Sequence, residues 1–272
     1  MRSWNANWLP SLAPADHASV HNDVNEAALW ERLSQSSRRA PLEPSWLGEV
    51  YSPSLSDELR QALAEKIGML AEAGWPLVQE LIHRHGRQRE LILAAGLTHQ
   101  PESRDWLLEQ LDQIDSELDA DQALVVLQAL ACWGGELPLA LIERTLGLPG
   151  LQLRLAGLQL LSFHAYQLDD STVLRLCEPL LNDFRDPVVL AAIRVLQRRD
   201  GSEVSERLAK LSGAVSETVA AAALRALGCI ATPNSQRWLL ELSQNLPDGE
   251  RKQAHCLRSP SGRFWLSSSN QR

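Results

Sequence analysis

The sequence predicts an all-α protein that is built as a solenoid of stacked helix pairs, and three observations support this. Leu and Ala dominate the middle of the chain, where β-branched residues are sparse, and this composition disfavours strands. Small apolar stretches with a helical pattern return at regular intervals. The motif Pro-x-Ser-x-x-Trp-Leu-Leu-Glu occurs twice, beginning at Pro101 and at Pro233.

The distance between the two motifs matches a repeat period. Similar apolar segments align on one equivalent position each, and the steps between these positions are 31, 35, 31 and 35 residues, with a mean of 33. The two motifs, 132 residues apart, are therefore four units apart, so we interpret the motif as a repeated helix start. The equivalent positions are Ile92, Leu127, Leu158, Ile193 and Leu224.

Each unit is predicted to contain two helices. The first is small and apolar, so that Ala and Gly let neighbouring backbones approach closely, and the second is amphipathic after a short break. Pro101 and Pro233 suit the first turn of the second helix, where a serine of the motif or a neighbouring residue would cap it. Because one pair cannot bury its apolar face alone, we expect the units to stack as a right-handed α-solenoid over residues 54–246. About six units are expected, at 55–85, 86–114, 118–148, 149–182, 184–212 and 214–246.

The two ends of the chain do not follow the repeat. Residues 1–53 form a non-repeat segment, in which 22–37 suits one amphipathic helix that caps the first unit. Trp4 and Trp8 are read as packing residues of this segment, with a docking role as the alternative. Residues 247–272 form a basic tail that is expected to be flexible, the alternative being contact with an acidic partner.

Composition excludes several function classes. A net charge of -8 argues against a nucleic-acid surface, and no apolar run is long enough for a membrane span. The start of the chain lacks the apolar core of a secretory signal, so a cytoplasmic location with reduced thiols is expected. No cysteine pair has metal-binding spacing, and no metal site is predicted. We expect Cys132, Cys177 and Cys229 to be core residues, and Cys256 to be the exposed thiol.

One unit carries a family resemblance. Residues 183–196, DFRDPVVLAAIRVL, resemble the HEAT-like repeat, and especially the short variety of the phycobilisome lyases, which has Asp-Pro-x-Val before an Ala-rich helix. Residues 216–221 have a similar start, and the resemblance covers roughly 55–246 by period and pattern. It implies a HEAT-like binding protein that helps to attach a linear tetrapyrrole, a phycobilin, to a cysteine of a phycobiliprotein.

The same resemblance implies the ligands and partners. If the protein is an enzyme, it is a lyase of the bilin-attachment type that works by positioning, with the phycobilin as substrate and no cofactor required. Its partners would be a phycobiliprotein subunit, a second HEAT-like subunit, or both. The alternative is a non-catalytic protein–protein scaffold or a factor for phycobilisome assembly or degradation, because a fold does not determine a function.

The turns inside the units supply the candidate site residues. These turns recur on one edge of a solenoid, and several carry aromatic, His or Arg residues, which suit the rings and carboxylates of a bilin. The alternative is structural, with the Trp closing a helix end and each His satisfied locally. By contrast, His83, Arg84 and His85 precede Gly86 and are read as cations at a helix C-terminus. The ligand- or partner-binding candidates are His99, Trp133, His164, Tyr166, Arg198 and Arg199.

Overall fold

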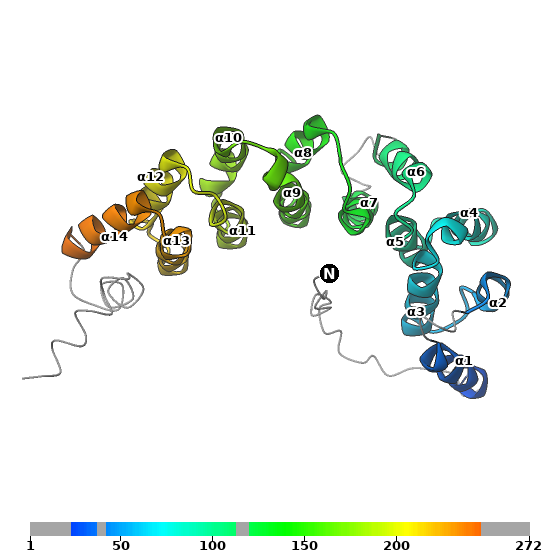
Figure 1. The fold of residues 1–272 in the computed structure, drawn as a ribbon. Helices are drawn as coiled ribbons and strands as arrows, with labels where there is room; N and C mark the ends of the chain where they lie inside the picture. Colours follow the sequence, from blue (N-terminus) through cyan, green and yellow to red (C-terminus); the bar gives the residue numbers. More distant parts are fainter. Residues whose placement is uncertain (1–22, 37–41, 113–119, 246–272) are drawn as a thin grey trace, which may run out of the picture.

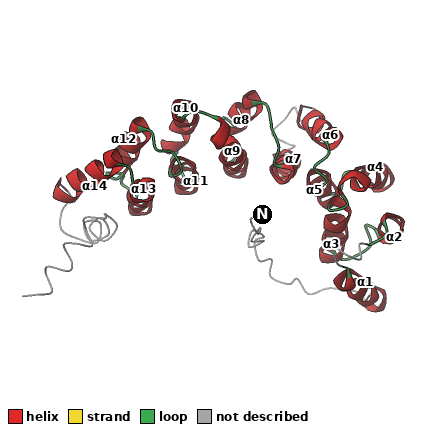
Figure 2. Cartoon of the chain, viewed as in Figure 1, coloured by secondary structure: helices red, strands yellow, loops and turns green. Residues whose placement is uncertain are grey.

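The chain forms an arc of two parallel rows of helices in a computed structural model that describes residues 23–36, 42–112 and 120–245. The described residues contain helices and loops and no strand (Figure 2). The predicted all-α solenoid is therefore confirmed, while its handedness and the boundaries at 53/54 and 246/247 stay predictions. None of the described helices is long and apolar enough to cross a membrane.

The helices of the two rows alternate along the chain (Figure 1). The first helix of each pair lies in the inner, concave row, and the second lies in the outer, convex row. Short 3-10 turns, η1 (Ala71–Ala73) and η3 (Ala165–Gln167), precede α4 and follow α9. The inner row holds α3 (Asp57–Gly68), α5 (Arg89–Leu97), α7 (Ala120–Trp133), α9 (Leu151–His164), α11 (Asp186–Leu196) and α13 (Glu217–Ile230). The outer row holds α4 (Gly74–His85), α6 (Pro101–Asp112), α8 (Leu139–Leu146), α10 (Asp170–Leu181), α12 (Ser202–Leu211) and α14 (Pro233–Asn245).

The repeat register derived from the sequence is confirmed by burial. The five equivalent positions all lie in the core between the rows, and none is more than 4% exposed. The core is continuous from Leu33 to Leu239, so each pair contributes to one shared apolar layer. This is the packing expected when a single pair cannot bury its own face.

Small residues bring the inner helices close together. A Cβ added to Gly96 on α5 would lie 2.0 Å from the carbonyl oxygen of Ala129 on α7. A Cβ on Gly68 of α3 would lie 2.8 Å from the carbonyl oxygen of Ala94 on α5. The predicted close approach of the first helices is therefore confirmed at these two positions.

The repeated motif does begin a helix in both places. Pro101 is the first residue of α6 and Pro233 is the first residue of α14. A threonine before the motif supplies the capping oxygen in α14, since Thr232 Oγ1 accepts a hydrogen bond from the Ser235 amide at 3.2 Å. Trp106 of the first motif packs against Trp75, with 5.7 Å between the ring centroids.

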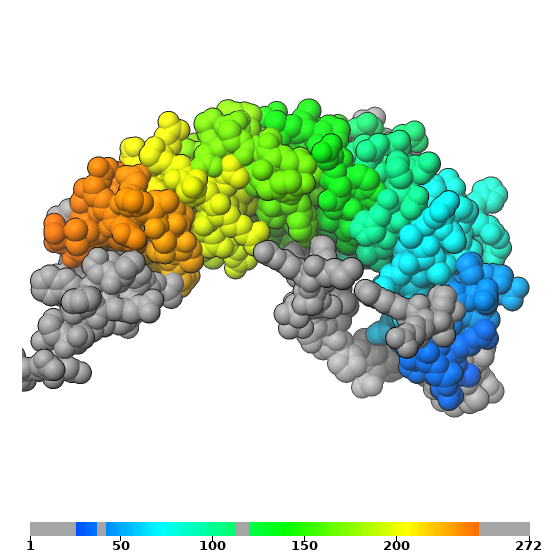
Figure 3. Space-filling model, in the orientation of Figure 1, coloured from blue at the N-terminus to red at the C-terminus, as the bar shows by residue number. Residues whose placement is uncertain are grey.

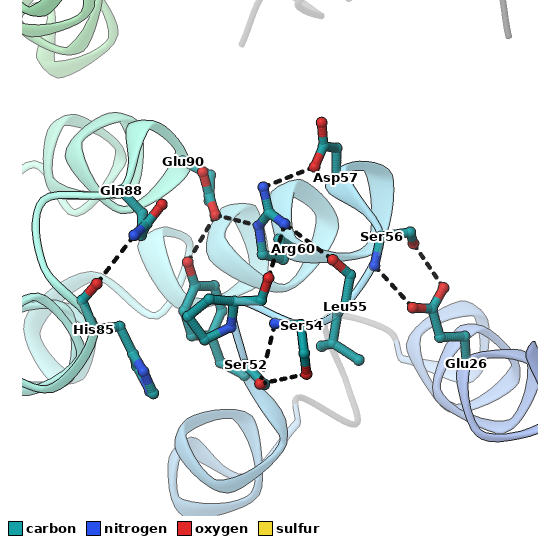
Figure 4. A network of polar contacts seen from close by, with 12 residues as sticks. Glu26, Ser52, Ser54, Leu55, Ser56, Asp57, Arg60, His85, Gln88 and Glu90 are labelled. Atoms are coloured by element: carbon teal, nitrogen blue, oxygen red, sulfur yellow. Dashed lines mark hydrogen bonds and ion pairs between the residues drawn. The ribbon is translucent and has the colours of Figure 1, made fainter. Parts of the chain in front are cut away.

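Helices α1 (Asp23–Gln35) and α2 (Pro44–Val50) pack on the first pair. Glu26 on α1 accepts hydrogen bonds from the amide and the hydroxyl of Ser56, at 2.8 and 2.7 Å (Figure 4). Tyr51 and Arg60 both donate to Glu90 Oε1, at 2.7 and 2.8 Å. These contacts join the segment before the repeat to the first two pairs. The predicted amphipathic helix near 22–37 is confirmed, whereas Trp4, Trp8, Cys256 and the basic tail lie outside the described residues.

Candidate functional site

His99 and Trp133 come together at the edge of the solenoid, in the turns that follow α5 and α7. His99 is exposed and has a left-handed backbone, with φ of 54°. Its Nδ1 donates to the Trp133 carbonyl oxygen at 2.8 Å, which fixes the proton on Nδ1 because a carbonyl only accepts. Trp133 Nε1 donates to the Gln100 carbonyl oxygen at 3.2 Å. The two residues thus tie consecutive turns together, with His99 exposed and Trp133 partly buried beneath Arg104.

His164 and Tyr166 lie two residues apart but differ in exposure, since the first is buried and the second is exposed. The His164 side chain is buried, and burial lowers its pKa, although Gln167 and Glu136 oppose that shift. Its imidazole is therefore neutral at neutral pH. Tyr166 is 77% exposed, and Gln167 donates to its hydroxyl at 2.9 Å. Tyr166 can therefore contact a ligand or partner at the surface, whereas His164 packs inside the solenoid.

Arg198 and Arg199 also differ, although they are adjacent. The Arg199 guanidinium contacts the Asp170 carboxylate and donates to the carbonyl oxygens of Ala165, at 2.8 Å, and Leu168. It therefore binds the turn after α11 to the turn after α9. Arg198 is exposed and makes no hydrogen bond or ion pair with any described residue. The six candidates remain a predicted site, with His99, Trp133, Tyr166 and Arg198 reaching its surface.

The described cysteines occupy three different environments. Cys177 is buried, and burial raises its pKa to about 12, with a smaller contribution from Glu178. Cys132 is half-buried and its pKa is also raised by burial. Cys229 is exposed, so its assignment to the core is wrong, because its position on α13 lies on the stripe that no other helix covers. Among the described residues, no three His, Cys, Asp or Glu side chains are grouped to hold a metal ion.

His83, Arg84 and His85 form the last turn of α4, as the sequence predicted. Gly86 follows α4 with φ of 82°, and its amide bonds to the Ile82 carbonyl oxygen at 2.9 Å. Arg84 pairs with Glu80 one turn earlier. His85 packs against Tyr51, with 5.6 Å between the ring centroids. The cationic end of α4 therefore has a structural role.

An open cavity that the sequence did not reveal lies between α5 and α7. It has a volume of about 640 Å³ and opens where both helices begin, at the opposite edge from the predicted site. Arg87 has no hydrogen bond or ion pair within the described residues, and Arg89 makes one 3.4 Å contact with Gln128. Two guanidinium groups therefore stand beside an apolar wall. The lining residues are Arg87, Arg89, Ile92, Asp121, Gln122, Leu124 and Val125.

The inner face presents a row of side chains whose charge changes along the arc, called the graded row below. Each inner helix packs against its neighbours and against the outer row, and one stripe of the helix keeps some exposure. The space-filling view shows the arc whose concave side the inner row lines (Figure 3). On this stripe, the residue that follows each of the five equivalent core positions is exposed or half-buried, and so is Glu65, which follows the buried Ala64 on α3. The row changes from acidic through apolar and amide to basic along the arc. Its members are Glu65, Leu93, Gln128, Gln159, Arg194 and Arg225.

The chain is similar in structure to several solved proteins. No protein-family model matches the sequence, and no curated protein matches it. The complex of CpcE and CpcF of phycocyanin lyase from Nostoc sp. PCC7120 is similar at 16% identity, over 84% of this chain and 96% of that one, with a TM-score of 0.44. Human deoxyhypusine hydroxylase in complex with glycerol is 17% identical over 89% and 91%, with a TM-score of 0.39. An engineered protein is 15% identical over 89% and 75%, with a TM-score of 0.49. At such identities and scores, these likenesses carry no argument about activity.

Proposed function

We propose that the protein is a helical-repeat binding protein that helps to attach a phycobilin to a cysteine of a phycobiliprotein. The observation that carries this proposal is the cavity between α5 and α7, which places two guanidinium groups beside an apolar wall. The resemblance of residues 183–196 to the repeats of the phycobilisome lyases supports it from the sequence.

A linear tetrapyrrole has the chemistry that this cavity complements. Arginine recognises carboxylates by paired, charge-assisted hydrogen bonds, so Arg87 and Arg89 would hold the two propionates. Ile92, Leu124 and Val125 offer apolar contact to the rings. The volume lies within the range of roughly 300–1,000 Å³ that is usual for small-molecule sites. The one carboxylate, Asp121, would repel a propionate and so favours a single orientation of the ligand.

In this proposal the chain positions the reactants, and the client protein supplies the nucleophile. A thiolate is the reactive form of cysteine, and burial raises the pKa values of Cys132 and Cys177, which keeps them neutral at neutral pH. Holding a bilin beside a client thiol converts a bimolecular encounter into a local one. The chain would then act as a lyase of the bilin-attachment type without a catalytic residue of its own.

The surface residues of the turn edge are proposed to contact the protein partner. His99, Trp133, Tyr166 and Arg198 reach solvent along that edge and combine aromatic, polar and cationic groups. Aromatic residues and Arg are the side chains most often found at the energetic centre of protein interfaces. The partner would be a phycobiliprotein subunit, a second HEAT-like subunit, or both.

The test is direct binding of a free phycobilin by the full chain, followed by visible absorption spectroscopy. Reversing both charges in Arg87→Glu/Arg89→Glu should weaken binding by about tenfold or more, since each lost carboxylate contact contributes on the order of 1 kcal/mol. The matched control is Lys210→Glu/Arg237→Glu, which changes the net charge equally on exposed positions of α12 and α14. Unchanged bilin spectra with the wild-type chain would contradict the proposal and favour a scaffold that binds only protein.

A further inference from the structure

A second group of unpaired arginines lies on the inner face, far along the chain from the cavity. Most described arginines make an ion pair, a hydrogen bond or a ring contact. Four described arginines make none, and Arg87 of the cavity is one of them. The other three are Arg194, Arg198 and Arg225, and all of them are exposed. Arg194 and Arg225 lie on consecutive inner helices, and Arg198 lies in the turn that follows the first of them. Three unpaired arginines in neighbouring units need an explanation.

These three side chains form one cationic patch. Arg194 on α11 and Arg225 on α13 are equivalent positions of the row, on inner helices that pack against each other. Axes of packed helices lie about 8–10 Å apart, which sets the spacing of this pair. Arg198 lies two residues beyond the end of α11, in the turn, and so stands at the border between this patch and the turn edge. Three positive charges at such spacing repel one another in the free protein, and a bound anion would relieve that repulsion.

The floor between the arginines is small and apolar. Ala191 on α11 and Ala222 on α13 occupy the stripe and are half-buried, and Leu190 stands beside them. Side chains of this size let another backbone approach the two helices closely. The patch therefore combines cations with a shallow apolar floor, which suits a polypeptide segment better than a lone small anion.

We propose that the patch formed by Arg194, Arg198 and Arg225 docks an acidic helical segment of a protein partner. Carboxylates at positions i and i+7 of such a helix lie about 10 Å apart, which matches the spacing of Arg194 and Arg225 when the segment crosses from α11 to α13. A carboxylate at i+4 lies between them on the same face of the segment. Glu65 lies at the opposite end of the row, so the basic end at α11 and α13 is the part of the row that attracts carboxylates. The acidic end of the segment therefore lies over α11 and α13. This inference does not depend on bilin binding.

Carboxylates are favoured over phosphates by the charge of the whole molecule. The chain has a net charge of -8, and nucleic-acid binding draws on many cations along a surface. Here three cations share a face whose other end is acidic. A short acidic segment fits this layout, whereas an extended polyanion would find no further cation along the row and would end at Glu65.

The experiment titrates the full-length chain into a fluorescein-labelled, Ala-rich helical peptide of about 20 residues with Glu at positions i, i+4 and i+7. A twin peptide carries Gln at the same positions. At about 50 mM salt, we expect the Glu peptide to bind about tenfold more tightly than the Gln peptide, and the difference to shrink as salt rises. Arg194→Glu/Arg225→Glu should abolish that difference, while Lys210→Glu/Arg237→Glu should preserve it.

Two further measurements make the result decisive. Circular dichroism should be the same for both variants and thermal unfolding nearly so, because the substituted side chains are exposed and the surface ion pairs of Lys210 and Arg237 contribute little. A third peptide with Lys in place of Glu should bind the reversed variant better than the wild type. Equal binding of the Glu and Gln peptides, or an unchanged preference in Arg194→Glu/Arg225→Glu, would overturn the proposal. Tighter binding of a single-stranded oligonucleotide than of the Glu peptide would also overturn it and assign the patch to phosphates.

Discussion

The outer and inner faces of the solenoid use arginine in different ways. On the outer face, three arginines form a ladder of ion pairs, in which each guanidinium contacts a carboxylate of the preceding outer helix. The nitrogen–oxygen distances are 2.7 to 3.0 Å. On the inner face, Arg225 has Arg194 as its neighbour in the preceding unit, and neither has a partner among the described residues. The repeat geometry is the same in both places, so the residue in the preceding unit decides whether an arginine stabilises the fold or stays free to bind. The outer pairs are Arg144–Asp112, Arg175–Glu143 and Arg207–Glu178.

The largest expected effect comes from the close packing of the inner row. Gly96→Ala should lower the free energy of unfolding by about 3 kcal/mol, because its Cβ would overlap the Ala129 carbonyl oxygen and α5 and α7 would have to separate. Gly147→Ala, at the end of α8, is the control, since a Cβ there meets no atom nearer than 3.4 Å. Urea denaturation of both variants measures the effect. Equal stability of the two would show that the inner row tolerates separation.

A smaller effect is expected from the charge cluster where α10 meets α11. The Asp183 carboxylate is fully buried between Arg154 and Arg185 and bonds to both. Asp183→Asn should cost about 2 kcal/mol at neutral pH, because two partly buried cations lose their counter-charge. Thermal unfolding against pH provides the measurement.

The pH dependence of that cluster has a definite sign. The hydrogen bonds from Arg185 hold the pKa of Asp183 well below its usual range, although burial opposes them. A depressed pKa in the folded state stabilises the protein above the unfolded value of about 3.9, and this stabilisation is lost as the pH falls further. The wild type and Asp183→Asn should therefore converge in stability on acidification below about pH 4. A constant difference down to the lowest pH would contradict the assignment.

The smallest expected effect comes from the outer ladder itself. A double-mutant cycle on Arg207 and Glu178 should give a coupling energy of about 0.5–1 kcal/mol that declines with salt, because both side chains are partly exposed. The more exposed pair Arg144 and Asp112 should give less. If Arg194 and Arg225 showed a comparable loss of stability on truncation, the contrast between the two faces would be wrong.

The sequence was sufficient to predict the repeat, but it was insufficient to predict which surface residues are free to bind. Apolar periodicity and proline position depend on local chain geometry, and they correctly located the core residue Leu127 and the helix starts at Pro101 and Pro233. Arg199 bonds to the neighbouring turn and Arg198 is exposed. This difference depends on where α11 ends, so the sequence could not distinguish the two residues. The cavity has walls from two units, and only stacking brings them together.

The measurement that tests the account most directly is covalent attachment of a phycobilin to an apo-phycobiliprotein subunit in the presence of the full chain. Fluorescence of the denatured subunit after electrophoresis reports the attached chromophore. The account predicts that the wild type accelerates attachment, that Lys210→Glu/Arg237→Glu does the same, and that Arg87→Glu/Arg89→Glu is slower by about tenfold. Attachment at the rate seen without the chain, or equal acceleration by all three proteins, would contradict it.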